Sequence, residues 1–250
     1  MARTVRFGGR LACVRLSPWG RVVAISALLV VGGAVALAVG ALASTRDRVV
    51  SYPVTGTLEG VAFDLGDGDI VIVGGGRREG VQVQRSERSA FGHRPVTERN
   101  VRGSVFGVKS RCPTALLSPC SVGYRVIVPD NIAVDVRTTG GDVSFRGYRG
   151  SARVTTTSGA IAITGYCGNS LDARAGTGDI TFDADCAPPR LSLRSYSGSI
   201  RAAIPPGRYD LDAESSAGDE RVRGVTATSA APYSVQVLST SGDVFVEGRS

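Results

Sequence analysis

Apolar and polar residues alternate along most of this chain, and glycines interrupt the alternation at a regular interval. Seven glycines occupy equivalent places in a repeated turn: Gly68, Gly141, Gly159, Gly178, Gly198, Gly218 and Gly242. The last six lie 18 to 24 residues apart. Because a strand places alternate side chains on opposite faces, the pattern predicts a strand on each side of every glycine. A period near 20 residues is typical of a repeat protein.

Four further positions of each unit are apolar, two before the glycine and two after it. When the seven units are aligned on the glycine, 28 residues fill these positions, and only Glu220 among them is polar. Such columns are expected when coils stack, because equivalent residues then lie directly above one another. We therefore predict an all-β chain that forms a parallel β-solenoid with coils of about 20 residues. A sandwich of antiparallel hairpins is the alternative, although it does not require this register.

Each repeated turn has features that suit a tight corner. Glycine supplies a positive φ without steric cost, and the Asp that usually follows it can accept hydrogen bonds from nearby backbone amides. Another small residue often stands six positions after the glycine, which predicts a second corner. Every change in unit length falls after this second corner, so insertions are expected at a single edge.

The period divides the chain into a repeat domain and flanking segments. Residues 44–54 form a predicted linker, and residues 55–250 form the predicted β-repeat domain. Residues 76–128 break the period, and we predict an irregular insertion there. No evident cap follows Gly248, so the last strand is expected to be an unpaired edge. Self-association through this C-terminal edge is a hypothesis.

The N-terminal segment predicts insertion into a membrane. Residues 22–43 carry no charge and are long enough for one transmembrane helix. Residues 1–21 contain five arginines and no acid, so the positive-inside rule predicts a cytoplasmic basic tail and an extracytoplasmic β domain. The alternative is a signal peptide cleaved after Ala43, which would give a secreted protein.

The net charge of +7 does not indicate nucleic-acid binding. Five of the positive charges belong to the tail, and the other charges alternate with apolar residues, as expected for a solvated strand face. We expect the chain to insert into the membrane and to bind an envelope protein or glycan, and we do not expect it to bind a nucleic acid.

Four cysteines predict two disulfides. Cys167 and Cys186 each lie eight residues after a repeat glycine, so stacking would place them one strand spacing apart, about 4.8 Å, within disulfide reach. Cys112 and Cys120 bracket a short loop and form the second predicted pair. Export from the cytosol would favour both bonds. The alternative is that all four are buried free thiols.

The chain offers few catalytic candidates. His93 is the only histidine and lies in a predicted loop, where a surface role is expected. Aspartates that follow the repeat glycine share one phase: Asp142, Asp179, Asp219 and Asp243. A calcium-binding repeat or a row of catalytic carboxylates would use such residues, but Ala160 and Ser199 interrupt the row. We therefore expect turn-capping aspartates, and assign no catalytic, cofactor-binding or metal-binding residue.

The turns TSGDV and GTGDI, and the run from Tyr124 to Pro129 that leads into residues 134–143, resemble a bacterial β-strand-repeat family labelled "putative adhesin", a domain of unknown function. The resemblance covers residues 55–250. It implies a right-handed β-helical domain of the cell envelope, and it implies no catalytic residue. Some proteins of this kind stand beside envelope-stress signalling systems.

These observations favour a non-enzymatic cell-envelope surface or scaffold protein that binds a protein or glycan through its β-solenoid. The second hypothesis is a signalling accessory that passes the state of the envelope through the N-terminal helix. The third is a polysaccharide-acting β-helix enzyme, which would depend on Asp142 or Asp179.

Overall fold

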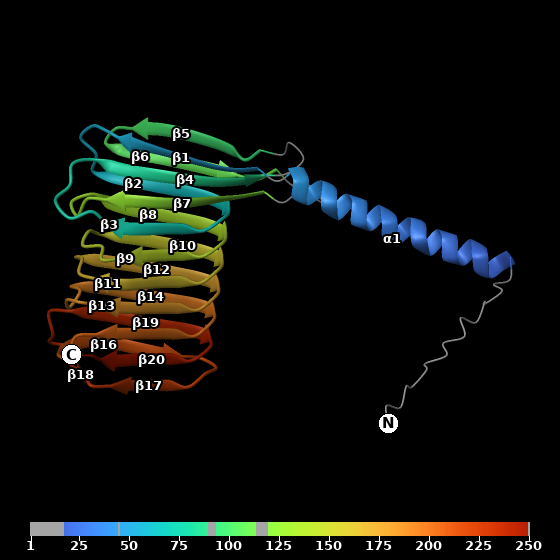
Figure 1. Cartoon of the computed structure of the whole chain (residues 1–250). Coiled ribbons are helices and arrows are strands. Elements are labelled where there is room, and N and C mark those ends of the chain that lie inside the picture. The colour runs from blue at the N-terminus through green and yellow to red at the C-terminus, as the bar shows by residue number, and fades with distance from the viewer. Residues whose placement is uncertain (1–17, 45, 90–93, 114–119, 250) are drawn as a thin grey trace, which may run out of the picture. The chain divides into compact units, whose positions relative to one another are not determined.

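The computed structural model describes residues 18–44, 46–89, 94–113 and 120–249. The chain divides into two compact units, Met1–Ser44 and Thr45–Ser250. The first unit holds one helix, α1 (Pro18–Ser44), and the second holds all the strands (Figure 1).

Helix α1 covers the whole of the range that was predicted to be helical, residues 22–43. Its described side chains are exposed, including Leu28 and Leu29. Among the described residues, no helix has both the length and the apolar character that a membrane crossing requires. The helix is therefore present, but its predicted transmembrane role is not confirmed.

The strands form two sheets of ten, which we call sheet A and sheet B. In spatial order, sheet A consists of β1 (Arg46–Val54), β4 (Val81–Ser89), β7 (Cys120–Val128), β3 (Ile70–Gly74), β9 (Val143–Arg146), β11 (Ile161–Tyr166), β13 (Ile180–Ala184), β15 (Ile200–Ile204), β20 (Val244–Gly248) and β17 (Glu220–Arg223). Sheet B consists of β18 (Thr226–Ala227), β16 (Arg208–Ser215), β19 (Ser234–Ser241), β14 (Arg190–Ser197), β12 (Ser170–Thr177), β10 (Ala152–Ser158), β8 (Ala133–Gly140), β2 (Gly60–Asp67), β6 (Val105–Arg111) and β5 (Val96–Arg102).

Each repeat unit gives one strand to each sheet, and neighbouring units pair in parallel. Ile161 pairs with Val143 on one side and with Ile180 on the other, so the apolar columns inferred from the sequence are present. These columns face the space between the sheets and are almost fully buried, except in the unit of Gly218. This arrangement is that of a parallel β-solenoid and rules out a sandwich of antiparallel hairpins. The hand of the coil stays a prediction.

Tyrosines close one side of the core near the second corner. Tyr148, Tyr166 and Tyr209 are buried, and their hydroxyls donate to backbone carbonyls, such as that of Ser170 at 2.7 Å from the Tyr166 hydroxyl. Burial raises the pKa of the Tyr148 and Tyr166 phenols well above the ordinary value. These side chains therefore remain neutral hydrogen-bond donors that tie the core to the corner.

The last coil of the sequence is not the last coil in space. Strand β20 lies between β15 and β17, and β19 lies between β14 and β16. The prediction of an unpaired C-terminal strand is therefore wrong, because both strands of the last unit are paired on both sides. The end of the stack is the preceding unit, where Glu220 is exposed. Its polar side chain is accommodated because no further coil covers it.

The predicted irregular insertion at 76–128 is more regular than expected. It contains four strands of seven to nine residues, β4 to β7. Strands β6 and β7 pair in parallel with β2 and β3, and β4 and β5 add antiparallel strands outside them. The segment therefore extends the solenoid by one coil and then covers that end of the stack (Figure 1).

Candidate functional site

The repeat glycines build a corner of each coil. A Cβ atom on Gly159 would lie 2.2 Å from the carbonyl oxygen of Gly141, and one on Gly178 would lie 2.2 Å from that of Gly159. The same close approach recurs along the whole column. Gly159 also has a φ of 137°, a conformation that side chains disfavour. Glycine is needed here because one backbone passes directly over the next.

The aspartates after these glycines hold the coils together. The Asp142 carboxylate accepts a hydrogen bond from the Ala160 amide at 2.8 Å, and the Asp179 carboxylate accepts one from the Ser199 amide at 2.8 Å. Asp69 and Asp243 accept equivalent bonds from the adjacent coil. Because the coil of Ala160 lies between them, Asp142 and Asp179 are two strand spacings apart, about 10 Å. Within the described ranges, no cluster of three or more His, Cys, Asp or Glu side chains could hold a metal ion.

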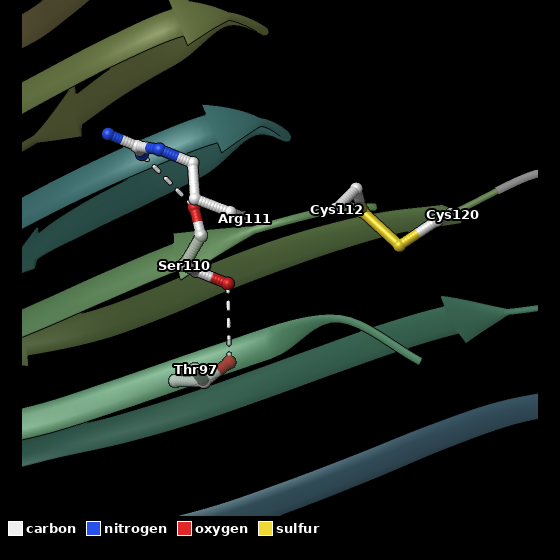
Figure 2. The surroundings of a disulfide bond; sticks show 5 residues. All are labelled: Thr97, Ser110, Arg111, Cys112 and Cys120. Atoms are coloured by element: carbon white, nitrogen blue, oxygen red, sulfur yellow. Dashed lines mark hydrogen bonds between the residues drawn. A yellow bond between two sulfur atoms is a disulfide. The ribbon is translucent and has the colours of Figure 1, made fainter. Parts of the chain in front are cut away.

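Both predicted disulfides are present. Cys167 and Cys186 join equivalent places in neighbouring coils, with their Cα atoms 4.8 Å apart. Cys112 and Cys120 connect the end of β6 to the start of β7, with their Cα atoms 5.8 Å apart (Figure 2). The bond between Cys167 and Cys186 links two neighbouring coils, and the bond between Cys112 and Cys120 closes the loop between β6 and β7. His93 lies outside the described residues.

A groove of about 900 Å³ runs along the outer face of sheet B. Its lining residues come from eight neighbouring strands: β6, β2, β8, β10, β12, β14, β19 and β16. At about 4.8 Å for each step between strands, the groove is about 34 Å long. Small side chains such as Ser151, Ser170 and Ser234 line one side of it. Its length and shape suit an extended ligand that lies across the strands.

Charges on this face change from strand to strand. On β12, the Arg174 guanidinium donates to both carboxylate oxygens of Asp172, at 3.0 and 2.8 Å, and Arg153 of β10 lies 3.7 Å from the same carboxylate. The charged outward residues of β14 are both basic, Arg190 and Arg194, whereas those of β16 are mostly acidic: Asp210, Asp212 and Glu214, with Arg208 at the start of the strand. The neutral strand β19 separates these two sets. The groove therefore offers both donors and acceptors along its length.

The comparisons with known proteins identify the segment that carries most of this groove. Residues 130–247 match the family described as Toastrack DUF4097. These residues form a Toastrack DUF4097 domain. The expected family relationship is thus confirmed for this segment. The Toastrack domain contains β8 to β20 and with them six of the eight groove strands, whereas β1 to β7 precede it. No curated protein matches the chain.

Solved structures with a similar fold include three bacterial proteins. A "putative cell adhesion protein" from Clostridium sporogenes is 11% identical, covers 82% of this chain and 100% of its own, and has a TM-score of 0.48. A "putative adhesin" from Bacteroides fragilis is 12% identical, and the match covers 82% of this chain and 97% of the adhesin, with a TM-score of 0.42. A "putative adhesin" from Parabacteroides merdae is 11% identical, and the match covers 81% of this chain and 97% of the adhesin, with a TM-score of 0.35. These likenesses are too distant to carry a function to the Toastrack domain.

The sequence did not predict the groove. Alternation placed Arg153, Asp172 and Arg194 on an outward face, but it did not show which strands are neighbours. In particular, β14 pairs with β19 and not with β16, although β16 follows it in the repeat order. The contrast between the basic residues of β14 and the acidic residues of β16 was visible in the sequence and could have indicated a charged surface.

Proposed function

We propose that this protein is a non-enzymatic surface module of the bacterial cell envelope, adhesin-like in its action, and that it binds an extended polymer along sheet B. The observation that carries this proposal is the groove across eight strands. A site for a small molecule is usually enclosed and mostly apolar. This one is open and long, and its lining mixes polar and apolar residues in about equal parts, which suits repeated hydrogen bonds and apolar contacts to a glycan or an extended peptide.

The positions of the repeat aspartates favour binding over hydrolysis. Glycoside hydrolysis needs two carboxylates that flank the bond to be broken, with one able to donate a proton. The carboxylates of Asp142 and Asp179 are instead engaged by backbone amides. Neither residue lines the groove. The residues that suggested a polysaccharide-acting enzyme therefore have a structural role in this account.

In this proposal, the Toastrack domain works outside the cytosol. Disulfides form and persist in oxidising compartments, and the described residues hold two of them, Cys112–Cys120 and Cys167–Cys186. The basic and apolar residues 1–43 agree with export, either through a retained anchor or through a signal peptide cleaved after Ala43. N-terminal sequencing of the mature protein distinguishes the anchor from the signal peptide, because a mature protein that starts at Ser44 has lost the anchor.

Co-sedimentation of the full chain with purified cell-wall sacculi tests the proposed function. Sacculi stripped of protein by protease keep glycan ligands and lose protein ligands, so the two preparations separate these partners. A tryptophan in place of the exposed Ser234 would fill the groove. We expect Ser234→Trp to weaken binding about tenfold or more, because a blocked site loses several contacts together.

Thr181→Trp is the matched control, because Thr181 is an exposed outward residue on β13 of sheet A. We expect it to bind sacculi like the unchanged protein, and both variants to keep the same melting temperature within a few degrees. Equal binding by the two variants would overturn the role of the groove. Release of new reducing sugar ends during the incubation would instead support an enzyme.

A further inference from the structure

Strand β14 presents an unusual set of side chains to the solvent. Its successive outward residues are Arg190, Ser192, Arg194 and Tyr196, since Leu191, Leu193 and Ser195 are buried. Alternate residues of a strand are about 6.6 Å apart. A positive charge, a hydroxyl and a second positive charge therefore follow one another across the groove, and an aromatic ring stands just beyond its edge.

The two arginines of β14 differ from the other arginines of the groove. Arg153 and Arg174 share the carboxylate of Asp172. Within the described part of the chain, neither Arg190 nor Arg194 forms an ion pair. Arg194 donates instead to the uncharged amide of Gln236. The β14 guanidinium groups thus keep their full positive charge for an incoming anion.

Ser192 stands between these arginines and lines the groove. Its Oγ is buried and has no hydrogen-bond partner among the described residues. Its neighbours in the pairing register are Asp172 on β12 and Gln236 on β19, which already bond to Arg174 and Arg194. A buried hydroxyl without a partner costs free energy, and a rotation of the Ser192 side chain toward the groove would let a bound oxygen atom supply the missing bond.

Tyr196 adds an exposed aromatic face beside Arg194. Its side chain is 69% exposed, more than any other large apolar side chain described in the β domain. The pairing register places it next to Gly176 on β12 and Thr240 on β19, whose small side chains leave the ring uncovered. An aromatic ring with a polar hydroxyl can pack against the apolar face of a sugar while bonding to its hydroxyl groups.

We propose that β14 is the subsite at which the groove binds an anionic sugar of an acidic polysaccharide. The carboxylate or phosphate group of one sugar lies between Arg194 and Arg190, where Ser192 donates to one of its oxygens, and a neighbouring sugar of the same polymer packs on Tyr196, about 13 Å along the strand from Ser192. The acidic residues of β16 repel the polymer's anionic groups at the end of the stack, and so favour placement on β14. This inference rests on the proposed function, because it assigns the ligand class of the same groove.

Calorimetric titration of the full chain with four soluble polymers tests the subsite. A polyuronate carries carboxylates on sugars, phosphomannan carries phosphates on sugars, dextran is neutral, and poly-glutamate is acidic without sugars. We expect one of the two acidic polysaccharides to bind, which identifies the anion, and dextran and poly-glutamate to bind at least about tenfold more weakly. Such a difference is the size expected for charge-assisted hydrogen bonds to the anion.

Substitutions at two positions separate the contribution of the charge from that of the ring. We expect Arg194→Gln to weaken binding of the acidic polysaccharide about tenfold or more, and Tyr196→Phe to retain most of the binding that Tyr196→Ala loses. Arg146→Gln is the matched control, because Arg146 is an exposed outward arginine on β9 of sheet A. We expect this control to leave the affinity unchanged.

The outcomes distinguish this subsite from the proposed function. Equal binding of dextran, or no effect of Arg194→Gln, would overturn the anionic subsite while binding to sacculi still stands. Equal binding of poly-glutamate would overturn the sugar assignment and favour an acidic protein partner. Failure of all four soluble polymers, with sacculi still bound, would also overturn the subsite. Loss of binding to both sacculi and polymers would overturn the proposed function itself.

Discussion

At the scale of single residues, a glycine and the aspartate after it set the corner of each coil. The glycine allows the backbone of one coil to approach the next, and the aspartate carboxylate accepts the amide of the adjacent coil. Ala160 and Ser199 occupy the aspartate position in two coils. The Ser199 hydroxyl still accepts from the Asp243 amide at 3.3 Å, whereas Ala160 has no side-chain oxygen to offer to Asp179.

Replacing Gly159 with alanine is expected to destabilise the fold strongly. The new Cβ would lie 2.2 Å from a carbonyl oxygen, and the residue would keep a φ of 137°. We expect Gly159→Ala to lower the free energy of unfolding by about 2–4 kcal/mol, measured by urea titration. Ser158→Ala, which removes one exposed hydrogen bond to Thr139, is the control and should cost less than about 1 kcal/mol. Equal effects would contradict the steric account of the glycine column.

Completing the row of side-chain acceptors is expected to stabilise the protein. An asparagine at position 160 would place a carbonyl oxygen near the Asp179 amide without adding a charge beside Asp142 and Asp179. We expect Ala160→Asn to raise the free energy of unfolding by about 0.5–1 kcal/mol. Asp142→Ala, which removes such an acceptor, should lower it by a similar amount. Thermal or urea denaturation measures the stability of both variants. A lower stability of Ala160→Asn than of the unchanged protein would contradict the role given to these side-chain acceptors.

At the scale of elements, the main finding is the exchange in order of the last two coils. The strands, the turns and the apolar columns could be predicted, because side-chain alternation and the corner glycine are local properties. The spatial order of coils could not, because the turns at Gly218 and Gly242 have similar local signals. Glu220 was the one sign of the exchange. A polar residue in a buried column marks the coil that nothing covers, as expected for a terminal repeat.

A matched pair of substitutions tests this order. Val222 and Val246 occupy the same column and pair with each other, but Val246 is 1% exposed and Val222 is 38% exposed. We expect Val246→Asp to destabilise the fold by at least about 3 kcal/mol, because it buries a charge. Val222→Asp should cost no more than about 1 kcal/mol. Circular dichroism during urea unfolding measures the free energy of unfolding of both variants. A larger loss in Val222→Asp than in Val246→Asp would indicate that the coils follow the sequence order.

At the scale of the whole molecule, both ends of the stack carry features that oppose pairing with another sheet. At one end, Pro53 lies on the edge strand β1, and β4 points the Arg85–Glu87 ion pair (2.6 Å) toward the inside. At the other end, every residue of β17 is exposed, and three of its four residues are charged. Charges and prolines of this kind prevent an edge strand from pairing with a strand of another molecule. These features oppose pairing with another sheet at the edge strands β1 and β17.

The candidate site could be predicted from the sequence only in part. The outward positions of Arg190, Arg194 and Asp212 follow from alternation, and so does the polar character of the face. The groove itself depends on which strands lie side by side, and the insertion of β19 between β14 and β16 separates the basic strand from the acidic one. Long-range pairing of this kind has no local signal in the chain.

Counting thiols in the non-reduced protein tests the disulfides and the N-terminus together. The chain has five cysteines, and Cys13 is the one outside the two bonded pairs. Labelling of the denatured protein with a maleimide reagent should modify one thiol per chain if residues 1–43 are retained, and none if they are removed. Labelling of four or five thiols would contradict both disulfides.

The most direct test of the central claim is hydroxyl-radical footprinting of the full chain with soluble fragments of the sacculi. Val105 lines the groove and Tyr196 lies on the same face of sheet B, whereas Phe245 lies on the outer face of sheet A. We expect the bound fragments to slow oxidation of Val105 and Tyr196 and to leave the rate at Phe245 unchanged. Protection of Phe245, with Val105 and Tyr196 oxidised at their original rates, would contradict the assignment of sheet B as the binding face.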